Sequence, residues 1–451
     1  MKLVLVGTGV RSPLFASAAL RRASKIGLTE LTLVDSDADR LKLFSSLVEE
    51  QSREAGSPVL VTHTTSAEEA FQGADHVVMT IRPGGEEGRV LDERIALKHG
   101  ILGQETTGPG GFAMALRTVP AVLRYAEQLE RISPGAWLYN FTNPAGLVTQ
   151  ALHDAGFSRV IGICDGANEA QKTVSEFLHV DQRELKASVV GLNHLSWALS
   201  VEHEGKEVLA SLLENPEFLA FGDLRIFDSG LIKLLGTYPN AYLYYFYYAE
   251  RAVEEILQSE STRGEEVRDI TSTLLSEMRS ASDPASALES FRAYHRRRGA
   301  TYMAHAREHA GEQIKAVGSA EGWSPSDEEG YAGVMLDAVE AIETNTPLQT
   351  ALNVPNAGAT AEMADDDVLE ISCLVDGSGV RTLPIPVIPP TALTLMRSVK
   401  EYERLTARAI AERSRSLAVE ALMCHPLVLS YSRATALVDE YLEAHREYIH
   451  W

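Results

Sequence analysis

The N-terminal stretch Leu3-Val4-Leu5-Val6-Gly7-Thr8-Gly9-Val10-Arg11-Ser12 decides the fold that we predict for this chain. Its apolar residues predict a buried strand, and its glycines allow a tight turn that presents a pyrophosphate to the N-terminus of the next helix. The pattern is G-x-G-x-x-S, where the dinucleotide-binding fingerprint usually ends in Gly or Ala. We therefore expect a dinucleotide to bind at Gly7, Gly9 and Ser12; an ordinary strand-to-helix turn is the alternative.

Asp35 ends the next predicted strand, at the position where such folds place an acidic residue. A carboxylate there can accept hydrogen bonds from the adenine ribose. It would also repel the extra phosphate of NADP. Asp35 therefore predicts NAD as the cofactor.

Short apolar runs alternate with helical stretches throughout residues 1–195. Runs such as 31–34, 77–81 and 160–163 are typical of strands buried on both faces of a parallel sheet. This βαβ order predicts an α/β protein whose N-terminal domain, residues 1–195, is a Rossmann-like doubly wound sheet. Residues 196–451 combine long helical stretches with predicted hairpins at 197–208 and 368–383, so we expect a second, α+β domain for substrate binding and oligomerisation.

The composition indicates a soluble enzyme. The 451 residues carry 41 basic and 63 acidic side chains, for a formal charge of −22. This charge repels nucleic acid and anionic membranes, so neither is an expected partner. Three widely spaced cysteines predict a reducing compartment, and no apolar run is long enough to span a membrane. We expect a cytoplasmic protein that acts on a small molecule.

Polar residues cluster with Gly and Pro after several predicted strands. The segments R-P-G-G from Arg82, G-Q-E-T-T-G-P-G-G from Gly103 and N-F-T-N-P from Asn140 each read as turn chemistry when taken alone. Together they place Arg82, Gln104, Glu105 and Asn143 at the carboxyl edge of the sheet, where ligands of such folds bind.

Four further residues have functional side chains but ambiguous contexts. Cys164 and Asp165 end one apolar run, and His194 follows another. A lone Cys and a lone His are usually a core thiol and a hydrogen-bonded imidazole, because zinc sites normally show paired ligands. Tyr242 lies in the tyrosine-rich segment 238–248, which is typical of an aromatic helix packed on the core; a phenol used as a base would need a nearby cation to lower its pKa.

In chain order, the motifs G-T-G-V-R-S-P, R-P-G-G, G-Q-E-T-T-G-P-G-G-F, N-F-T-N-P-A-G, I-G-I-C-D and V-G-L-N-H resemble glycoside hydrolase family 4, the NAD- and manganese-dependent glycosidases. The segments N-A-Y-L-Y-Y, T-R-G-E-E-V and L-E-A-H-R-E-Y are similar to family segments too, so the resemblance covers nearly the whole chain. It implies a sheet like that of lactate and malate dehydrogenases, NAD and Mn²⁺ (or another divalent metal) as cofactors, and a homodimer or homotetramer.

The resemblance also implies a mechanism. In this family NAD removes hydride from C3 of the sugar, a tyrosine removes the acidified C2 proton, the aglycone leaves, water adds and the hydride returns. The metal stabilises charge on the C2 and C3 oxygens. Tyr242 matches the base, and Cys164 and His194 match the metal ligands. The matched substrate-contacting positions are Arg82, Asn143 and Arg263.

A phosphorylated sugar would need local positive charge in this acidic chain. Arg263 and the run Arg296-Arg297-Arg298 are the candidates. We favour Arg263, because a run of three arginines is usually a solvated helix face.

The chain combines features of two branches of the family. Several motifs, including N-A-Y-L-Y-Y, are similar to 6-phospho-β-glucosidases, which typically have C-N-V-P after the strand. Cys164-Asp165 instead resembles the C-D-M-P of 6-phospho-α-glucosidases, whose Asp is a candidate acid for the leaving group. We therefore add Asp165 to the catalytic candidates and expect a 6-phospho-β-glucosidase. The alternatives are the α-specific enzyme and, less favoured, an NAD-dependent hydroxyacid dehydrogenase; a silent binding protein would not need Cys164, His194 and Tyr242 together.

Overall fold

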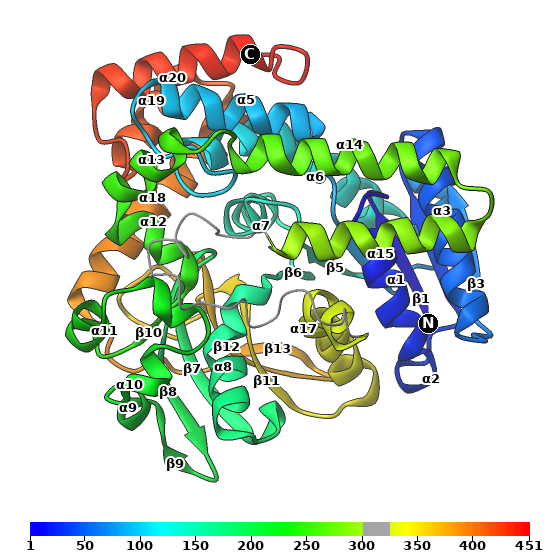
Figure 1. Ribbon diagram of the computed structural model, residues 1–451, viewed down its shortest axis with the longest axis horizontal. Helices are drawn as coiled ribbons and strands as arrows, with labels where there is room; N and C mark the ends of the chain where they lie inside the picture. Colours follow the sequence, from blue (N-terminus) through cyan, green and yellow to red (C-terminus); the bar gives the residue numbers. More distant parts are fainter. Residues whose placement is uncertain (301–324) are drawn as a thin grey trace.

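The computed structural model describes residues 1–300 and 325–451, without the side chains of Asp165 and of residues 299–300 and 325–331. Within these residues the larger sheet has nine strands in the order β13-β12-β11-β6-β5-β4-β1-β2-β3 (Figure 1). Its parallel part comprises β1 (Lys2–Val6), β2 (Glu30–Val34), β3 (Leu60–Thr64), β4 (His76–Met79), β5 (Trp137–Asn140) and β6 (Val160–Gly162). The spatial order 3-2-1-4-5-6 is that of the Rossmann fold, which confirms the predicted fold class.

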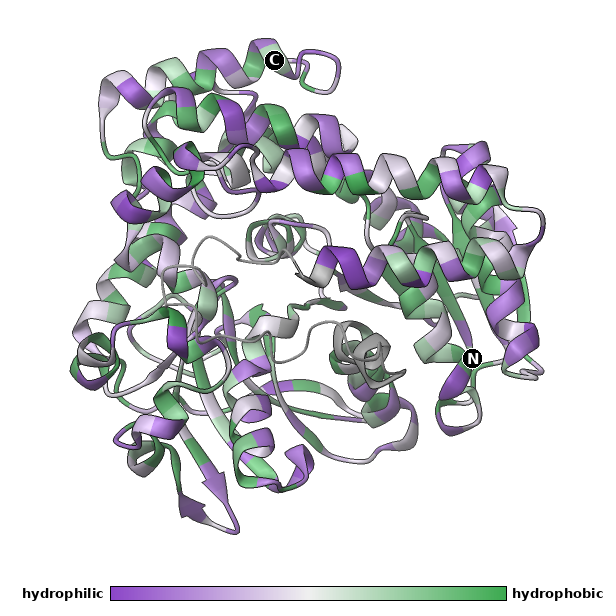
Figure 2. Cartoon of the chain, viewed as in Figure 1, coloured by the Kyte–Doolittle hydropathy of each residue, from purple (hydrophilic) through white to green (hydrophobic). Residues whose placement is uncertain are grey.

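Helices pack on this sheet in two groups. α1 (Ser12–Arg21) contacts α3 (Ala38–Glu54) and α17 (Pro325–Thr344), whereas α6 (Pro109–Ile132) contacts α4 (Ala67–Phe71) and α7 (Ala145–Asp154). The strands are apolar because helices cover them: residues 3–6 of β1 are at most 1% exposed. Figure 2 shows hydrophobic residues along these strands and hydrophilic residues on the outer sides of the helices.

Three antiparallel strands from the second half of the chain extend the same sheet. β11 (Leu348–Pro355) pairs with β6 through Asn353 and Gly162, and β12 (Val368–Asp376) and β13 (Gly379–Thr382) follow. The hairpin predicted at 368–383 is therefore confirmed. Its position was not predicted, since sequence periodicity does not report which strand a hairpin joins.

A smaller sheet lies beside the larger one. β8 (Leu195–His203) runs between β7 (Leu185–Leu192) and β10 (Tyr238–Pro239), and β9 (Lys206–Glu207) turns back on β8. The hairpin expected at 197–208 is thus present. Ser372 of β12 joins the two sheets, because its hydroxyl accepts from the N–H of Val189 and donates to the carbonyl of Ala187, both at 2.8 Å.

The remaining described helices surround the sheets. Those longer than eight residues are α5 (Gly85–Lys98), α8 (Glu169–Leu178), α13 (Ala249–Gln258), α14 (Arg263–Ser280), α15 (Pro284–Ala300), α18 (Pro390–Glu412), α19 (Arg415–Cys424) and α20 (Tyr431–Ala444). The shorter ones are α2 (Ala23–Ile26), α9 (Leu209–Leu212), α10 (Pro216–Leu219), α11 (Ser229–Leu235), α12 (Tyr244–Tyr247) and the 3₁₀ turns η1 (Asp165–Asn168), η2 (Gln182–Glu184), η3 (Gly222–Ile226) and η4 (Ala241–Leu243).

A buried ionic network attaches the C-terminal segment to α5 and α6. Arg117 donates to both carboxylate oxygens of Asp92 at 2.9 and 2.6 Å, and Nε2 of His445 lies 2.6 Å from Asp92 Oδ1. All three side chains are buried. Removing the shared anion would leave a buried guanidinium without its main counter-charge.

We expect Asp92→Ala to lower the free energy of unfolding by about 3–5 kcal/mol, the usual cost of breaking a buried ion pair from one side. Urea denaturation measures this change. Asp439→Ala is the matched control. It breaks the exposed ion pair between Asp439 of α20 and Arg415 of α19, and it should lower the free energy of unfolding by at most about 1 kcal/mol. Equal losses in the two variants would contradict the prediction.

Candidate functional site

The glycine turn after β1 brings two backbones together. Gly7 has φ +96°, and a Cβ atom there would lie 2.9 Å from the carbonyl carbon of Thr80, just beyond β4. Glycine is therefore required at this position. Ser12 begins α1, and its buried hydroxyl donates to the carbonyl of Gly9 at 2.9 Å, which closes the turn.

A cavity of about 690 Å³ lies beside this turn, at the carboxyl ends of the parallel strands. Among the predicted site residues, Gly7, Gly9, Asp35, Arg82 and Asn143 line it. Ser12, Cys164, His194, Tyr242 and Arg263 do not. Sequence reasoning missed other lining residues, among them Arg11, Arg124, Thr271, Leu275, Glu447, Tyr448 and His450. Arg11 belongs to the motif G-T-G-V-R-S-P, and Glu447 and Tyr448 belong to L-E-A-H-R-E-Y, but these motifs gave the three residues no role. The others come from elements far from the glycine turn in sequence.

Asp35 faces this cavity with a carboxylate that already braces the turn. Its Oδ2 accepts from the N–H and the hydroxyl of Thr8 at 2.7 and 3.0 Å, and its Oδ1 accepts from the N–H of Asp37 at 2.9 Å. A carboxylate offers about four lone-pair positions. Asp35 can therefore accept a further hydrogen bond from a ligand hydroxyl.

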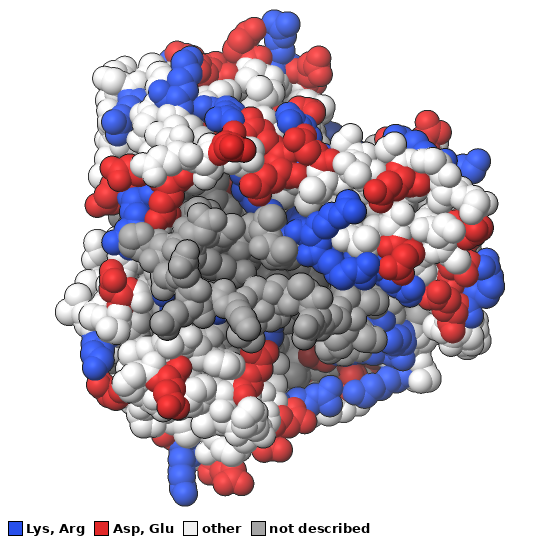
Figure 3. Space-filling view, viewed as in Figure 1, with Lys and Arg blue, Asp and Glu red and all other residues white. Residues whose placement is uncertain are grey.

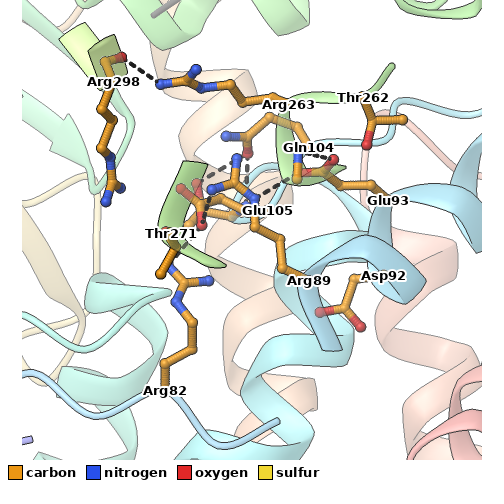
Figure 4. A network of polar contacts seen from close by, with 12 residues as sticks. Arg82, Arg89, Asp92, Glu93, Gln104, Glu105, Thr262, Arg263, Thr271 and Arg298 are labelled. Atoms are coloured by element: carbon orange, nitrogen blue, oxygen red, sulfur yellow. Dashed lines mark hydrogen bonds and ion pairs between the residues drawn. The ribbon is translucent and has the colours of Figure 1, made fainter. Parts of the chain in front are cut away.

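Arg82 and Glu105, which we expected at the same sheet edge, are in direct contact (Figure 4). Arg82 Nη2 lies 2.8 Å and Arg89 Nη1 3.3 Å from Glu105 Oε2. Burial alone would raise the pKa of Glu105, but the charges of Arg89 and Arg82 outweigh it and hold that pKa well below its usual range. Glu105 is therefore an anion that fixes the two guanidinium groups.

Arg263 lies beside Arg298, near the cluster of Arg82, Arg89 and Glu105 (Figure 4). As the first residue of α14, it donates from Nη2 to the carbonyl of Arg298 at 2.9 Å, and its Nη1 lies 3.4 Å from Glu266. Burial lowers the pKa of Arg263, and the positive charges of Arg298 and Arg89 lower it further. Crowded cations of this kind suit an anionic ligand.

The run Arg296-Arg297-Arg298 divides its side chains between two environments. Arg296 and Arg297 are exposed and pair with Glu289 and Glu277 on the surface, whereas Arg298 lines the cavity. Figure 3 shows basic side chains gathered over this end of α15. The expectation that the whole run is a solvated helix face is therefore wrong for Arg298, because the last turn of α15 packs toward the glycine turn through His295, whose Nε2 lies 3.1 Å from the carbonyl of Val10.

His194 and Tyr242 stack on each other. Their rings are parallel within 1°, with centroids 3.7 Å apart. His194 occupies the two-residue turn between β7 and β8 with a left-handed backbone, φ +62°. Tyr242 lies on η4, whose first turn is capped by Asn240 through a 2.9 Å hydrogen bond from the N–H of Tyr242. Two residues far apart in sequence thus share one site.

A hydrogen-bond chain selects the tautomer of His194. Gln104 Oε1 accepts from the backbone N–H groups of Thr106 and Thr107, so it is the amide oxygen, and the hydroxyl of Thr106 donates to it at 3.0 Å. The same hydroxyl lies 2.8 Å from His194 Nδ1, and when it donates to Gln104 it can only accept from Nδ1. Burial lowers the pKa of His194 to about 4, so the ring is neutral. With Thr106 donating to Gln104, the ring proton lies on Nδ1 and the lone pair on Nε2.

Cys164 lies after β6 and is linked to Tyr242 through Asn240. Asn240 Nδ2 donates to the carbonyl of Gly166 at 3.0 Å, and a Cβ atom on Gly166 would lie 3.6 Å from Cys164 Sγ. Cys164, His194 and Tyr242 therefore belong to neighbouring turns that Asn240 ties together. The side chain of Asp165 lies outside the described residues.

Few side chains that can ligate a metal lie at these turns. In the described part of the chain, no three His, Cys, Asp or Glu side chains gather as a metal site would require. A soft thiol and a neutral imidazole with a free lone pair are nevertheless suitable ligands for a divalent transition metal. A metal held by Cys164 and His194 would take its other ligands from substrate or water.

The strand order and the cavity at the sheet edge place the chain in the class of Rossmann-like α/β enzymes. A family model for the family 4 glycosyl hydrolases matches residues 2–180, and one for the family 4 glycosyl hydrolase C-terminal domain matches residues 189–428. The chain therefore belongs to the family 4 glycosyl hydrolases, which confirms the family expected from its motifs.

Relatives with both anomeric specificities are similar to the chain. A probable 6-phospho-β-glucosidase of Bacillus subtilis is 28% identical, with 100% of this chain and 97% of the relative covered. A maltose-6′-phosphate glucosidase of Clostridium acetobutylicum is 27% identical, with 99% and 98% covered. The family assignment is thus firm, whereas these relatives do not separate β from α specificity.

Solved structures of both β- and α-specific 6-phosphoglucosidases are also similar to the chain. The 6-phospho-β-glucosidase of Thermotoga maritima, with manganese, NAD⁺ and glucose-6-phosphate, has a TM-score of 0.81 at 28% identity and covers 100% of this chain and 99% of its own. A 6-phospho-α-glucosidase from gut microorganisms, in complex with NAD and Mn²⁺, has a TM-score of 0.81 at 25% identity, with 99% and 98% covered. A malate dehydrogenase of Plasmodium falciparum (TM-score 0.51, 12% identity, 92% and 99% covered) shares the fold alone, which gives the dehydrogenase alternative no support.

No helix among the described residues has the length and apolar character needed to cross a lipid bilayer.

Proposed function

We propose that this chain hydrolyses 6-phospho-β-glucosides, with NAD and a divalent metal, Mn²⁺ in the first place, as cofactors. The observation that carries the proposal is the pairing of a neutral His194, with its Nε2 lone pair free for a metal, and the stacked phenol of Tyr242. Neither a dehydrogenase nor a two-carboxylate glycosidase needs this combination. The relatives named above, which act on 6-phosphoglucosides, support the phosphorylated substrate.

The cavity fits a dinucleotide. Gly7 and Gly9 leave the backbone of the turn bare before α1, and Asp35 has lone pairs left for ribose hydroxyls. When bound, NAD would supply a hydride acceptor and Mn²⁺ a Lewis acid for the sugar oxygens. We assign Gly7, Gly9, Ser12 and Asp35 to cofactor binding. Ser12 acts indirectly, because its hydroxyl closes the glycine turn.

Tyr242 is our candidate for the base that takes the C2 proton. Its ring lies against His194, and a divalent cation held by Cys164 and His194 would favour the ionised phenol. Arg82 and Asn143 line the cavity and are assigned to substrate binding. Asp165 is the candidate acid for the leaving group.

We assign the sugar phosphate to the positively charged pair Arg263 and Arg298. Arg263 remains our first candidate, and Arg298 joins it because its carbonyl accepts from Arg263 while its side chain faces the cavity. This local positive charge would offset the −22 charge of the chain.

We further propose two domains, residues 1–195 for NAD and residues 196–451 for substrate and assembly, although β11–β13 complete the first sheet. A cytoplasmic homodimer or homotetramer is our expectation for the assembly.

Paired α- and β-nitrophenyl glucosides, with and without 6-phosphate, test the substrate class. We expect turnover of the 6-phospho-β-glucoside with Mn²⁺ and catalytic NAD, and no net NADH. Turnover of only the 6-phospho-α-glucoside, which Asp165 and the α-specific relatives favour, would correct the anomer; NADH that accumulates with product would contradict the glycosidase cycle.

Asp35 provides a prediction on the cofactor. Asp35→Ala removes both the ribose acceptor and the brace on Thr8, so NAD should bind about tenfold more weakly, the cost of roughly one charge-assisted hydrogen bond. The preference for NAD over NADP should narrow at the same time, because the repelling carboxylate is gone. Calorimetric titration with both cofactors measures this change. Equal affinities in the parent protein would show that Asp35 does not select the cofactor.

A further inference from the structure

Glu370 is a fully buried acid that no step of the proposed reaction uses. It lies on β12, at 0% exposure, directly opposite Asn353 of β11. Its Oε1 accepts from the hydroxyl of Ser196 at 2.7 Å. Its Oε2 accepts from Nδ2 of Asn353 at 3.0 Å and from Nδ2 of Asn193 at 3.3 Å. A buried carboxylate with three donors is a strong, directional anchor.

Two of these donors flank His194. Asn193 precedes it in the β7–β8 turn and Ser196 follows on β8. The left-handed backbone of His194 costs roughly 1 kcal/mol or more, so surrounding contacts must hold it. Glu370 therefore holds the turn through hydrogen bonds to residues on both sides of His194.

The same carboxylate is connected to β6, the strand that precedes Cys164. Asn353, its third donor, pairs with Gly162 at the end of β6, two residues before Cys164. The fit there is close, because a Cβ atom on Gly162 would lie 2.8 Å from Cβ of Asn353. Glu370 thus lies between two turns that belong to different sheets.

We infer that Glu370 is a positioning residue, which holds the His194 turn in place relative to β6 and so sets the affinity of Cys164 and His194 for a divalent metal. The inference rests on the proposed function for the metal ligands. It adds a residue that touches neither metal nor substrate. Outer partners of metal ligands typically contribute 10- to 100-fold in affinity, since they fix ring orientation before the metal arrives.

Glu370→Leu tests this role. Leucine fills a similar volume but has no acceptor oxygen, so Ser196, Asn193 and Asn353 all lose their shared partner. We expect Mn²⁺ alone, titrated against the full chain and followed by the electron spin resonance of free Mn²⁺, to bind about 10- to 100-fold more weakly. NAD affinity, measured separately, should stay within about twofold, because the glycine turn is elsewhere.

Ser372→Ala is the matched control. It lies two residues further along β12, is buried and also bonds the smaller sheet, but at Val189 and Ala187 rather than at the His194 turn. It should lower the thermal midpoint while Mn²⁺ affinity stays within about twofold of the parent. If Glu370→Leu lowers the midpoint and binds Mn²⁺ as the parent does, its role is structural and the inference is overturned.

Two further sets of variants cover the remaining outcomes. If Glu370→Leu does not fold, the double variant Asn193→Ala with Ser196→Ala removes the same hydrogen bonds from the side of the turn and should weaken Mn²⁺ binding. Parent affinity in this double variant overturns the inference. Cys164→Ser and His194→Ala test the proposed site itself. If these two bind Mn²⁺ like the parent, the metal assignment fails, and this failure is distinct from that of Glu370.

Discussion

Tyr242→Phe should lower kcat by about 10²- to 10⁴-fold, the usual contribution of a positioned general base. The phenylalanine ring can keep the stacking on His194, with its 3.7 Å centroid separation, but it has no group to accept a proton. If Tyr242 takes the C2 proton, that proton can exchange with solvent while it is held on the enzyme. Product formed in heavy water should therefore carry deuterium at C2, which mass spectrometry of the released sugar detects.

The neighbouring Tyr244 provides the control. It lies in the same aromatic segment, but its hydroxyl donates to Glu255 at 2.9 Å, away from His194. Tyr244→Phe should retain turnover and C2 labelling. An ordinary two-carboxylate glycosidase never breaks the C2–H bond. Unlabelled product from the active parent enzyme would therefore contradict the proposed mechanism.

The parallel half of the fold could be predicted from the sequence because its information is local. Runs such as 3–6 and 77–79 are apolar throughout, which is typical of a strand covered on both faces. The position of β11–β13 beside β6 could not be predicted. Asn353 meets Gly162 through a contact between distant segments, and neither residue signals that contact in its own neighbourhood.

Helix boundaries also differ in whether a local sequence signal predicts them. The sequence pattern alone predicts a helical stretch from about residue 391 to 423, whereas α18 ends at Glu412 and α19 begins at Arg415. Arg413 is left-handed, with φ +52°, and Ser414 caps α19 by accepting from the N–H of Leu417. An arginine does not predict a left-handed backbone at the end of a helix, because Gly and Asn are the residues usually found there.

Within the site, local motifs located the glycine turn and the carboxyl-edge residues, and the family resemblance supplied roles for Cys164, His194 and Tyr242. The partners that orient them were not predictable. Thr106 selects the tautomer of His194 from a loop, and Asn240 ties the Cys164 turn to Tyr242. Such contacts depend on tertiary packing, which a single sequence does not contain.

Cys164→Ser and His194→Ala should each weaken Mn²⁺ binding by about a hundredfold or more, because losing a direct ligand should cost more than losing an outer partner. Metal-dependent hydrolysis should be lost with it. Two protein ligands leave no redundancy, so neither residue can compensate for the other. NAD binding and the thermal midpoint in the absence of metal should change little, since neither side chain belongs to the glycine turn or to the Asp92 network.

The three cysteines permit a matched comparison. Cys424 is a half-buried thiol at the end of α19, so Cys424→Ser makes the same chemical change away from the turns that Asn240 connects. It should retain both Mn²⁺ affinity and turnover. A serine hydroxyl at residue 164 is a harder and less readily ionised ligand than a thiolate, so a softer metal such as Cd²⁺ should lose more affinity than Mn²⁺ in Cys164→Ser. Equal losses for the two metals would place the metal away from the sulfur of Cys164, and full activity of either ligand variant at saturating Mn²⁺ would contradict the assignment of the site.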